Sequence, residues 1–308
     1  MRVALVLLIW ASAIDFAAAH GFDAAGHAVS WRDWSSDPVV LVPLLLAVWL
    51  YARGAKALWS RAGIGRGILR LHAMSFALGA LAIAAALASP LDVLSGTLLS
   101  AHMAQHGLLV VVAPPLLVFG NPGVALVWAL PPSWRERIAT SKRWRFWAAL
   151  GRAFSRPLPA AAMQGLALWA WHVPAAFDAA AANYPVHLLE HACFLGTALL
   201  FWRAILAAGS PHRTVSALAA VFATLIHSGL LGALITLAPV VLYTHYSEPV
   251  RRWGLIAIED QQLAGLLMWV PMGVVYIGAC LMLASRLVVT KEARAMPVTG
   301  LKGRVVLP

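Results

Sequence analysis

The sequence predicts an all-α polytopic integral membrane protein, a bundle of about seven transmembrane helices that follows an N-terminal signal peptide. Of its 308 residues 61% are hydrophobic and only 11% are charged, whereas a soluble globular chain carries roughly 25% charged residues. Apolar runs of roughly 20 residues, the length that crosses the hydrocarbon core of a bilayer, recur between short polar segments. We therefore expect lipid to surround most of this chain.

Residues 1–19 have the features of a signal peptide. A single basic residue precedes the apolar stretch 3–14, and the alanines at 17–19 supply the small side chains that signal peptidase requires. An uncleaved anchor helix is the alternative, because Asp15 interrupts the end of the apolar stretch. In either case residues 20–37 form a segment outside the cytoplasm.

Seven apolar segments are predicted to span the membrane as one helical domain, residues 38–285, which a basic tail, residues 286–308, follows. The first segment is short, but Trp49 and Tyr51 near its end suit the membrane interface. The predicted spans are 38–51, 68–89, 94–119, 158–177, 186–206, 215–238 and 263–285.

The distribution of basic residues predicts the orientation of the bundle. Segments 53–70, 131–156, 203–213 and the tail hold most of the 23 lysines and arginines, so the positive-inside rule places them in the cytoplasm. The net charge of +11 therefore indicates topology rather than nucleic-acid binding. Segment 131–156 also has tryptophan and phenylalanine residues between its arginines and lysines. We therefore expect it to lie on the anionic inner leaflet, and docking of a partner protein is the alternative.

Five histidines are predicted to lie at one depth, near the outer ends of three helices. His102 and His106 are four residues apart, as are His187 and His191, and residues at this spacing share a helix face about 6 Å apart. His172 ends the fourth predicted span. Histidine is costly inside a membrane, so this grouping predicts a metal site, whereas a single membrane histidine is more often a hydrogen-bonded structural residue.

Copper is the metal that the neighbouring residues favour, as Cu(I) or Cu(II), with zinc as the alternative. Imidazole suits several transition metals, and thioethers shift the preference toward cuprous copper. Met103 and Met268 are the candidate soft ligands, although such methionines also fill hydrophobic cores. Glu190 is a further candidate, favoured here as the acceptor of an imidazole N–H beside the metal.

Three blocks of this sequence resemble the multi-pass CtaG family of cytochrome c oxidase assembly factors. The first runs from Ala101-His102-Met103-Ala104-Gln105-His106 through the double proline at 114–115. The second joins Trp171-His172-Val173-Pro174 to His187-Leu188-Leu189-Glu190-His191, and the third runs from Tyr243 to Asp260-Gln261-Gln262 and Met268-Trp269. The resemblance covers residues 94–276.

This resemblance implies a protein of the bacterial plasma membrane that supplies copper to a maturing haem-copper oxidase and is not itself an enzyme. The implied partner is an immature oxidase subunit or a periplasmic copper donor. The double proline is expected to break or kink its helix. The residues expected to support the site are Gln105, Tyr243, Asp260, Gln261 and Met272. Apart from the resemblance, the position of His20, His27 and His245 in outer segments indicates that they could pass metal inward.

Two other functions stay open from the sequence. The order His187, Glu190 and His191 matches the His-x-x-Glu-His motif of inverted zinc metallopeptidases, in which the glutamate is the general base. Facing histidines in a helix bundle can also ligate a non-covalent haem, as in an electron carrier.

Overall fold

The computed structural model describes residues 32–154 and 156–295, and every regular element within these residues is helical. The predicted signal peptide, together with His20 and His27, lies outside the described residues. The prediction of an all-α polytopic bundle is confirmed.

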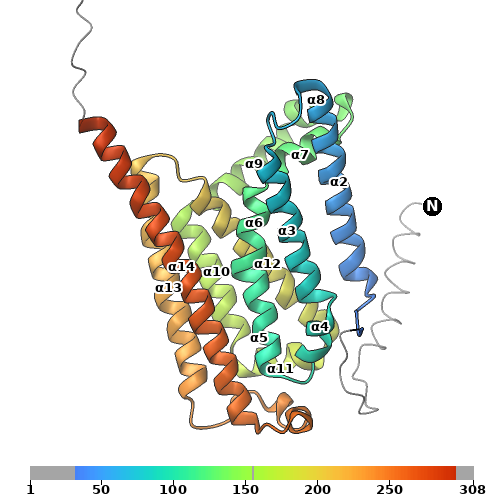
Figure 1. Ribbon diagram of the computed structural model, residues 1–308, viewed down its shortest axis with the longest axis vertical. Coiled ribbons are helices and arrows are strands. Elements are labelled where there is room, and N and C mark those ends of the chain that lie inside the picture. The colour runs from blue at the N-terminus through green and yellow to red at the C-terminus, as the bar shows by residue number, and fades with distance from the viewer. Residues whose placement is uncertain (1–31, 155, 296–308) are drawn as a thin grey trace, which may run out of the picture.

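The long helices run alternately in opposite directions between the two ends of the bundle (Figure 1). Within the described residues, six helical segments are long and apolar enough to cross a membrane, and α10 is not among them; the predicted number of seven spans stays a prediction. The long helices are α2 (Pro38–Ala62), α3 (Arg70–Leu87), α5 (Leu99–Gly107) with η2 (Leu108–Val112) and α6 (Ala113–Phe119), α10 (Pro157–Trp171), α12 (Tyr184–Leu206), α13 (Pro211–Leu237) and α14 (Ala257–Ala295).

The predicted fourth span, 158–177, is divided into two helices. α10 ends at Trp171, and α11 (Pro174–Ala182) begins after His172 and Val173. Val173 has the extended conformation expected of a residue that precedes proline. The apolar sequence continues across this break, so Pro174 is the residue of the sequence that indicates where the helix is divided.

Three further predicted boundaries shift because charged residues do not by themselves end a helix. α2 continues beyond Tyr51 through three basic residues and ends where Gly63 adopts a φ of 93°. α14 extends beyond both ends of the predicted span 263–285.

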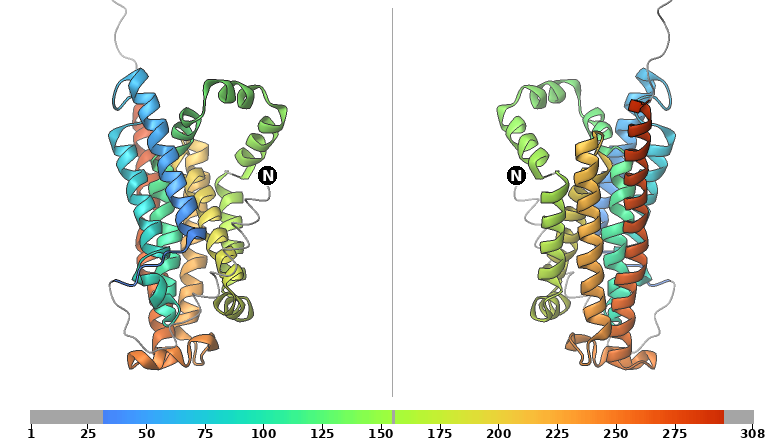
Figure 2. Two further views of the ribbon diagram at one scale, coloured as in Figure 1. Left: turned by 90° about the vertical axis from the view of Figure 1, so that its right-hand side faces the viewer. Right: turned by 90° about the vertical axis from the view of Figure 1, so that its left-hand side faces the viewer.

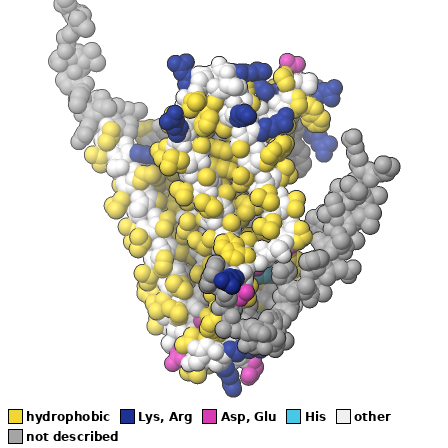
Figure 3. Space-filling view, turned by 45° about the vertical axis from the view of Figure 1, so that its right-hand side comes forward, with side chains coloured by type: hydrophobic (Ala, Val, Ile, Leu, Met, Phe, Trp, Pro, Cys, Tyr) yellow, Lys and Arg dark blue, Asp and Glu magenta, His cyan; other side chains and the backbone are white. Residues whose placement is uncertain are grey.

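The two ends of the bundle differ in their side chains. Figure 3 shows lysine and arginine gathered at one end, a broad hydrophobic belt, and most of the visible acidic side chains toward the other end. We name them the basic end and the histidine end. The basic end holds α7 (Pro122–Ala129), α8 (Pro132–Thr140) and α9 (Lys142–Phe154), and the histidine end holds α4 (Pro90–Ser95), α11, η3 (Thr244–Tyr246) and η4 (Pro249–Trp253).

Helices α13 and α14 pack closely because two glycines meet at their crossing. A Cβ atom added at Gly265 would lie 2.7 Å from the carbonyl oxygen of Gly232, and one added at Gly232 would lie 3.0 Å from that of Gly265. Small residues allow such close backbone approach between membrane helices. The crossing fixes the first turns of α14, which contribute Asp260 and Gln261 to the histidine end.

Candidate metal centre

Helix α5 is anchored at its N-terminus by a residue of α14. The backbone N–H of Leu99 donates to Oδ2 of Asp260 at 2.6 Å, and that of Ser100 donates to Oδ1 at 3.2 Å. The first N–H groups of a helix have no intrahelical partner, and a carboxylate there also complements the helix dipole. Asp260 therefore fixes where α5 begins, and with it the positions of His102 and His106.

The double proline changes the winding of this helix rather than ending it. Pro114 lacks an N–H group, which frees the carbonyl of Val110, and residues Leu108–Val112 form the π-helical turn η2 between α5 and α6. Nε1 of Trp202 in α12 donates to the Val110 oxygen at 2.9 Å. Of the expected break or kink, the break does not occur, because a π-helical turn accommodates the two prolines. The freed carbonyl connects the two helices that carry the histidine pairs.

Five histidines from three helical segments meet at the histidine end. The ring centroids of His102 and His106 lie 4.3 Å apart, and those of His187 and His191 lie 4.1 Å apart. Across the two helices, His102 lies 5.1 Å from His187 and 5.8 Å from His191. His172, which caps the end of α10, lies 5.8 Å from His106. We name these five residues the histidine cluster.

Four side chains place their donor atoms close enough to share one ion. One donor atom from each of His102, His187, Glu190 and His191 lies within 4.8 Å of the others. Ligand atoms at about 2 Å from a common transition metal lie at most about 4 Å from one another. The spacing of the four donor atoms is therefore close to that of a shared coordination sphere, and His106 and His172 border this group.

The polar atoms of the cluster are buried, and most have no hydrogen-bond partner among the described residues. Buried polar groups in native proteins are nearly always paired. Donor atoms that converge without partners are the arrangement expected of a site that binds a metal ion, so the residues present fit such an ion. The unpaired atoms are Nε2 of His102, His106, His172, His187 and His191, Nδ1 of His106, and both carboxylate oxygens of Glu190.

Two imidazoles have their Nδ1 atoms occupied by neighbours. Nδ1 of His172 lies 2.7 Å from the carbonyl oxygen of Leu168, which can only accept, so we assign the proton to Nδ1. Nδ1 of His102 lies 3.2 Å from Oη of Tyr246, which itself donates to the Ser95 carbonyl at 3.0 Å. The His102 Nδ1–H group then donates to the phenol oxygen. In both residues Nε2 keeps the lone pair that a metal requires.

Glu190 lies between the histidine pairs. Its Oε2 is 3.7 Å from Nε2 of His102 and its Oε1 is 3.8 Å from Nε2 of His106. These separations exceed a hydrogen bond, so the structure does not place Glu190 as the acceptor of an imidazole N–H that the sequence analysis favoured. The residue has 0% exposure, and a buried carboxylate without hydrogen bonds is costly unless a cation compensates its charge.

The predicted methionine ligands lie in the hydrophobic core at the same end. Met103 and Met268, together with the predicted supporting residue Met272, are buried in one core cluster with the aromatic residues Phe177 and Phe194, whose rings contact His102 and His106 respectively. Their packing fits core filling, the other interpretation of these residues, and the role of Met103 and Met268 as ligands stays a prediction.

Three predicted supporting residues hold the backbone around the cluster. Nε2 of Gln105 donates to the carbonyl oxygen of Ala86 in α3 at 2.7 Å. Tyr243 donates through Oη to the His172 carbonyl at 3.0 Å. Oε1 of Gln261 accepts from the Leu242 N–H at 2.6 Å, because the chain between α13 and η3 has backbone groups that no helix satisfies.

The loop after α13 covers the cluster and contributes residues that the sequence analysis did not identify. His245, one of the residues expected to pass metal inward, is half-buried in η3 with its ring centroid 5.3 Å from that of Tyr246. Burial lowers the pKa of His245, and Asp178 opposes this shift. Tyr246 was not predicted, since loop residues have no periodicity that indicates which helix they contact. Phe177 of α11 was not predicted either, because it is one apolar residue among many in a predicted span.

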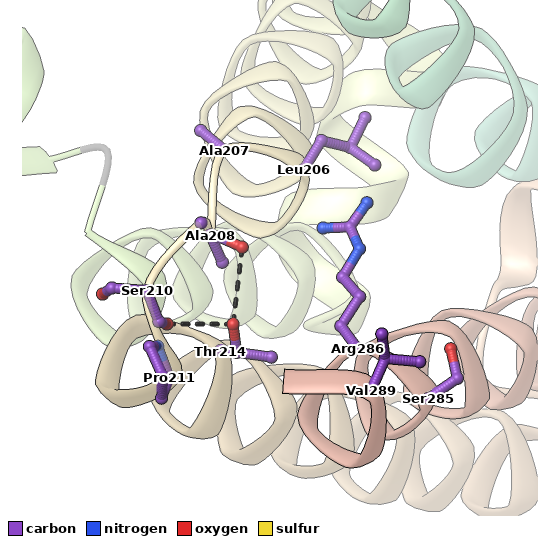
Figure 4. A pocket seen from close by; sticks show the side chains of 10 residues that line it. Leu206, Ala207, Ala208, Ser210, Pro211, Thr214, Ser285, Arg286 and Val289 are labelled. Atoms are coloured by element: carbon purple, nitrogen blue, oxygen red, sulfur yellow. Dashed lines mark hydrogen bonds between the residues drawn. The ribbon is translucent and has the colours of Figure 1, made fainter. Parts of the chain in front are cut away.

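A separate pocket lies where α12 ends, away from the histidines at the start of that helix. It has a volume of about 450 Å³ and opens between the loop that precedes α13 and the last turns of α14, with Arg286 on one wall (Figure 4). Thr214 in its wall donates to the Ser210 carbonyl at 2.9 Å. Its lining contains no histidine, cysteine or carboxylate, so it lacks the usual side-chain ligands of a transition metal.

Comparison with known proteins places most of the bundle in one family. No curated protein and no solved structure matches the chain. The family of cytochrome c oxidase caa3 assembly factors matches residues 49–289, which include every residue of the histidine cluster, the double proline and the anchoring Asp260. On this match the chain belongs to the cytochrome c oxidase caa3 assembly factor family, Caa3_CtaG.

Proposed function

We propose that this protein binds copper at the histidine cluster and supplies it to cytochrome c oxidase during assembly, without catalysing a reaction. The observation that carries this proposal is the convergence of donor atoms from His102, His187, Glu190 and His191 within 4.8 Å. Glu190 supplies one negative charge, which offsets the cost of holding a cation in a site closed to water.

The chemistry of the donors supports copper. Three imidazoles and a carboxylate suit Cu(II) or zinc, and a site of given ligands binds Cu(II) more tightly than zinc. His106 and His172 adjoin the four donors, so ligands can be exchanged as the ion is received or released. Zinc is the alternative metal, and membership in a family that assembles a haem-copper enzyme favours copper.

The charge distribution supports delivery outside the cytoplasm. Because the basic end is the end expected in the cytoplasm, the histidine end faces the outer side of the bacterial plasma membrane. The cluster there would receive copper from a periplasmic donor and pass it to an immature oxidase subunit. The carboxylates visible toward that end (Figure 3) would attract cations.

Metal analysis of the purified full-length chain tests the proposal. The wild type should retain copper in stoichiometric amount, and the double variant His102→Ala, His106→Ala should not. Membranes of cells that carry the double variant should also lose oxidase activity. His212→Ala is the matched control, because His212 is exposed and lies in the first turn of α13, away from the histidine cluster. Full copper retention by the double variant would contradict this site, and zinc in place of copper would contradict the choice of metal.

An absorption spectrum separates the proposal from haem binding. The short spacings within the cluster, such as 4.3 Å between His102 and His106, suit one small ion shared by the rings. We expect no Soret band from the purified protein, and a strong Soret band that disappears in the double variant would favour the electron carrier.

A further inference from the structure

The hairpin of α8 and α9 presents a basic surface that the copper proposal does not use. Figure 2 shows it arching away from the bundle near the basic end. Residues 132–154 contain one acidic residue, Glu136. Their basic residues are Arg135, Arg137, Lys142, Arg143, Arg145 and Arg152.

The arginines of this hairpin differ in what they contact. Arg135 is held against the bundle, since its Nε donates to the Leu130 carbonyl at 2.9 Å and its guanidinium lies 4.6 Å from the ring centroid of Trp128. Arg137 and Arg143 are exposed. They line a cleft between the two helices with a volume of about 290 Å³.

Two tryptophans complete the cleft. Its lining consists of Trp134, Arg137, Ile138, Ser141, Arg143 and Trp144. Trp134 is 56% exposed and Trp144 is 54% exposed, which is unfavourable in water but suits the headgroup layer of a membrane, where indole rings concentrate. Guanidinium groups bind phosphate with paired, charge-assisted hydrogen bonds.

We propose that this cleft binds the headgroup phosphate of an anionic phospholipid in the membrane that surrounds the bundle, and so holds the hairpin on the membrane surface. Charge complementarity determines the occupant: the surface is almost purely cationic, and the nearest extended anionic surface is the inner leaflet, to which each Lys or Arg adds favourable binding energy. The indoles of Trp134 and Trp144 then lie at the level of the headgroups, and Arg137 and Arg143 contact the phosphate.

Hydrogen–deuterium exchange of the full chain in nanodiscs tests this proposal. In discs that contain phosphatidylglycerol, residues 132–154 should exchange about tenfold more slowly than in pure phosphatidylcholine discs. The double variant Arg137→Gln, Arg143→Gln should lose this difference. The double variant Arg251→Gln, Arg252→Gln, at two exposed arginines of the histidine end, should keep it.

Three outcomes would overturn the proposal. Exchange that is equal in the two kinds of disc would show that the hairpin does not recognise anionic lipid. Equal protection by inorganic phosphate in detergent would assign the cleft to a soluble anion, and protection that requires an added oxidase subunit would assign it to protein docking. Copper content of the Arg137→Gln, Arg143→Gln variant serves as the folding control, because the histidine cluster lies at the other end of the bundle.

Discussion

Oη of Tyr246 lies 3.2 Å from Nδ1 of His102, although the two residues are 144 positions apart. Because Oη also contacts the Ser95 carbonyl, the phenol holds His102 in the tautomer whose Nε2 is available to a metal.

Removal of this hydroxyl should weaken metal binding without removing a ligand. In Tyr246→Phe the imidazole loses its Nδ1 partner, and loss of such a supporting contact typically lowers metal affinity about 10- to 100-fold. Copper affinity measured by competition with a chelator checks this expectation. Tyr51→Phe is the control, since Tyr51 is also buried and donates to the Gly120 carbonyl away from the cluster. Equal affinities of the two variants would contradict the role assigned to Tyr246.

Neutralising Glu190 should have opposite effects on the metal-free and metal-bound protein. At a pH where Glu190 is ionised, Glu190→Gln removes a buried charge that has no hydrogen bond, so the metal-free protein should there unfold at a higher temperature. Its copper affinity should fall about tenfold or more, because a charged donor is lost.

The same variant tests the metallopeptidase alternative. Copper supply predicts that oxidase maturation fails in Glu190→Gln. If oxidase activity stayed normal while cleavage of a membrane substrate stopped, Glu190 would be a general base and the copper proposal would be wrong.

Asp260 should stabilise the start of α5 as a helix cap supplied by another helix. In Asp260→Ala the N–H groups of Leu99 and Ser100 lose their acceptor, which should lower the free energy of unfolding by about 1–2 kcal/mol. Copper affinity should fall as well, since His102 lies one turn further on. Thermal unfolding in detergent measures the first effect. Glu259→Ala, at an exposed neighbouring carboxylate, should change the unfolding temperature much less.

The crossing of α13 and α14 should not tolerate a side chain at Gly265. Gly265→Ala places a methyl group against the Gly232 carbonyl, and such overpacking costs about 1–3 kcal/mol. Gly278→Ala on the same helix meets no atom within 4 Å and should be neutral or slightly stabilising. Equal unfolding temperatures for the two variants would show that this crossing is not a close contact in the folded protein.

The sequence by itself determined the class of the fold and the residues worth examining. Apolar runs of membrane length can only be helices or closed barrels in lipid, and the four-residue spacing of His187 and His191 places them on one helix face. These are local properties, which a sequence displays directly. Helix ends were less well predicted. Pro174 divides a continuous apolar run into two helices, and α2 extends beyond Tyr51 through several basic residues.

Only the tertiary structure decided how the helices face one another. It brought Tyr246 to His102 and Asp260 to the start of α5, turned Gln261 toward a loop, and placed Glu190 beside Nε2 of His102 rather than within hydrogen-bond distance. Such contacts join residues that are distant along the chain, and they depend on helix rotation and close packing, such as that at Gly232 and Gly265. Periodicity shows which residues share a face of one helix, but it does not show which face of another helix they meet.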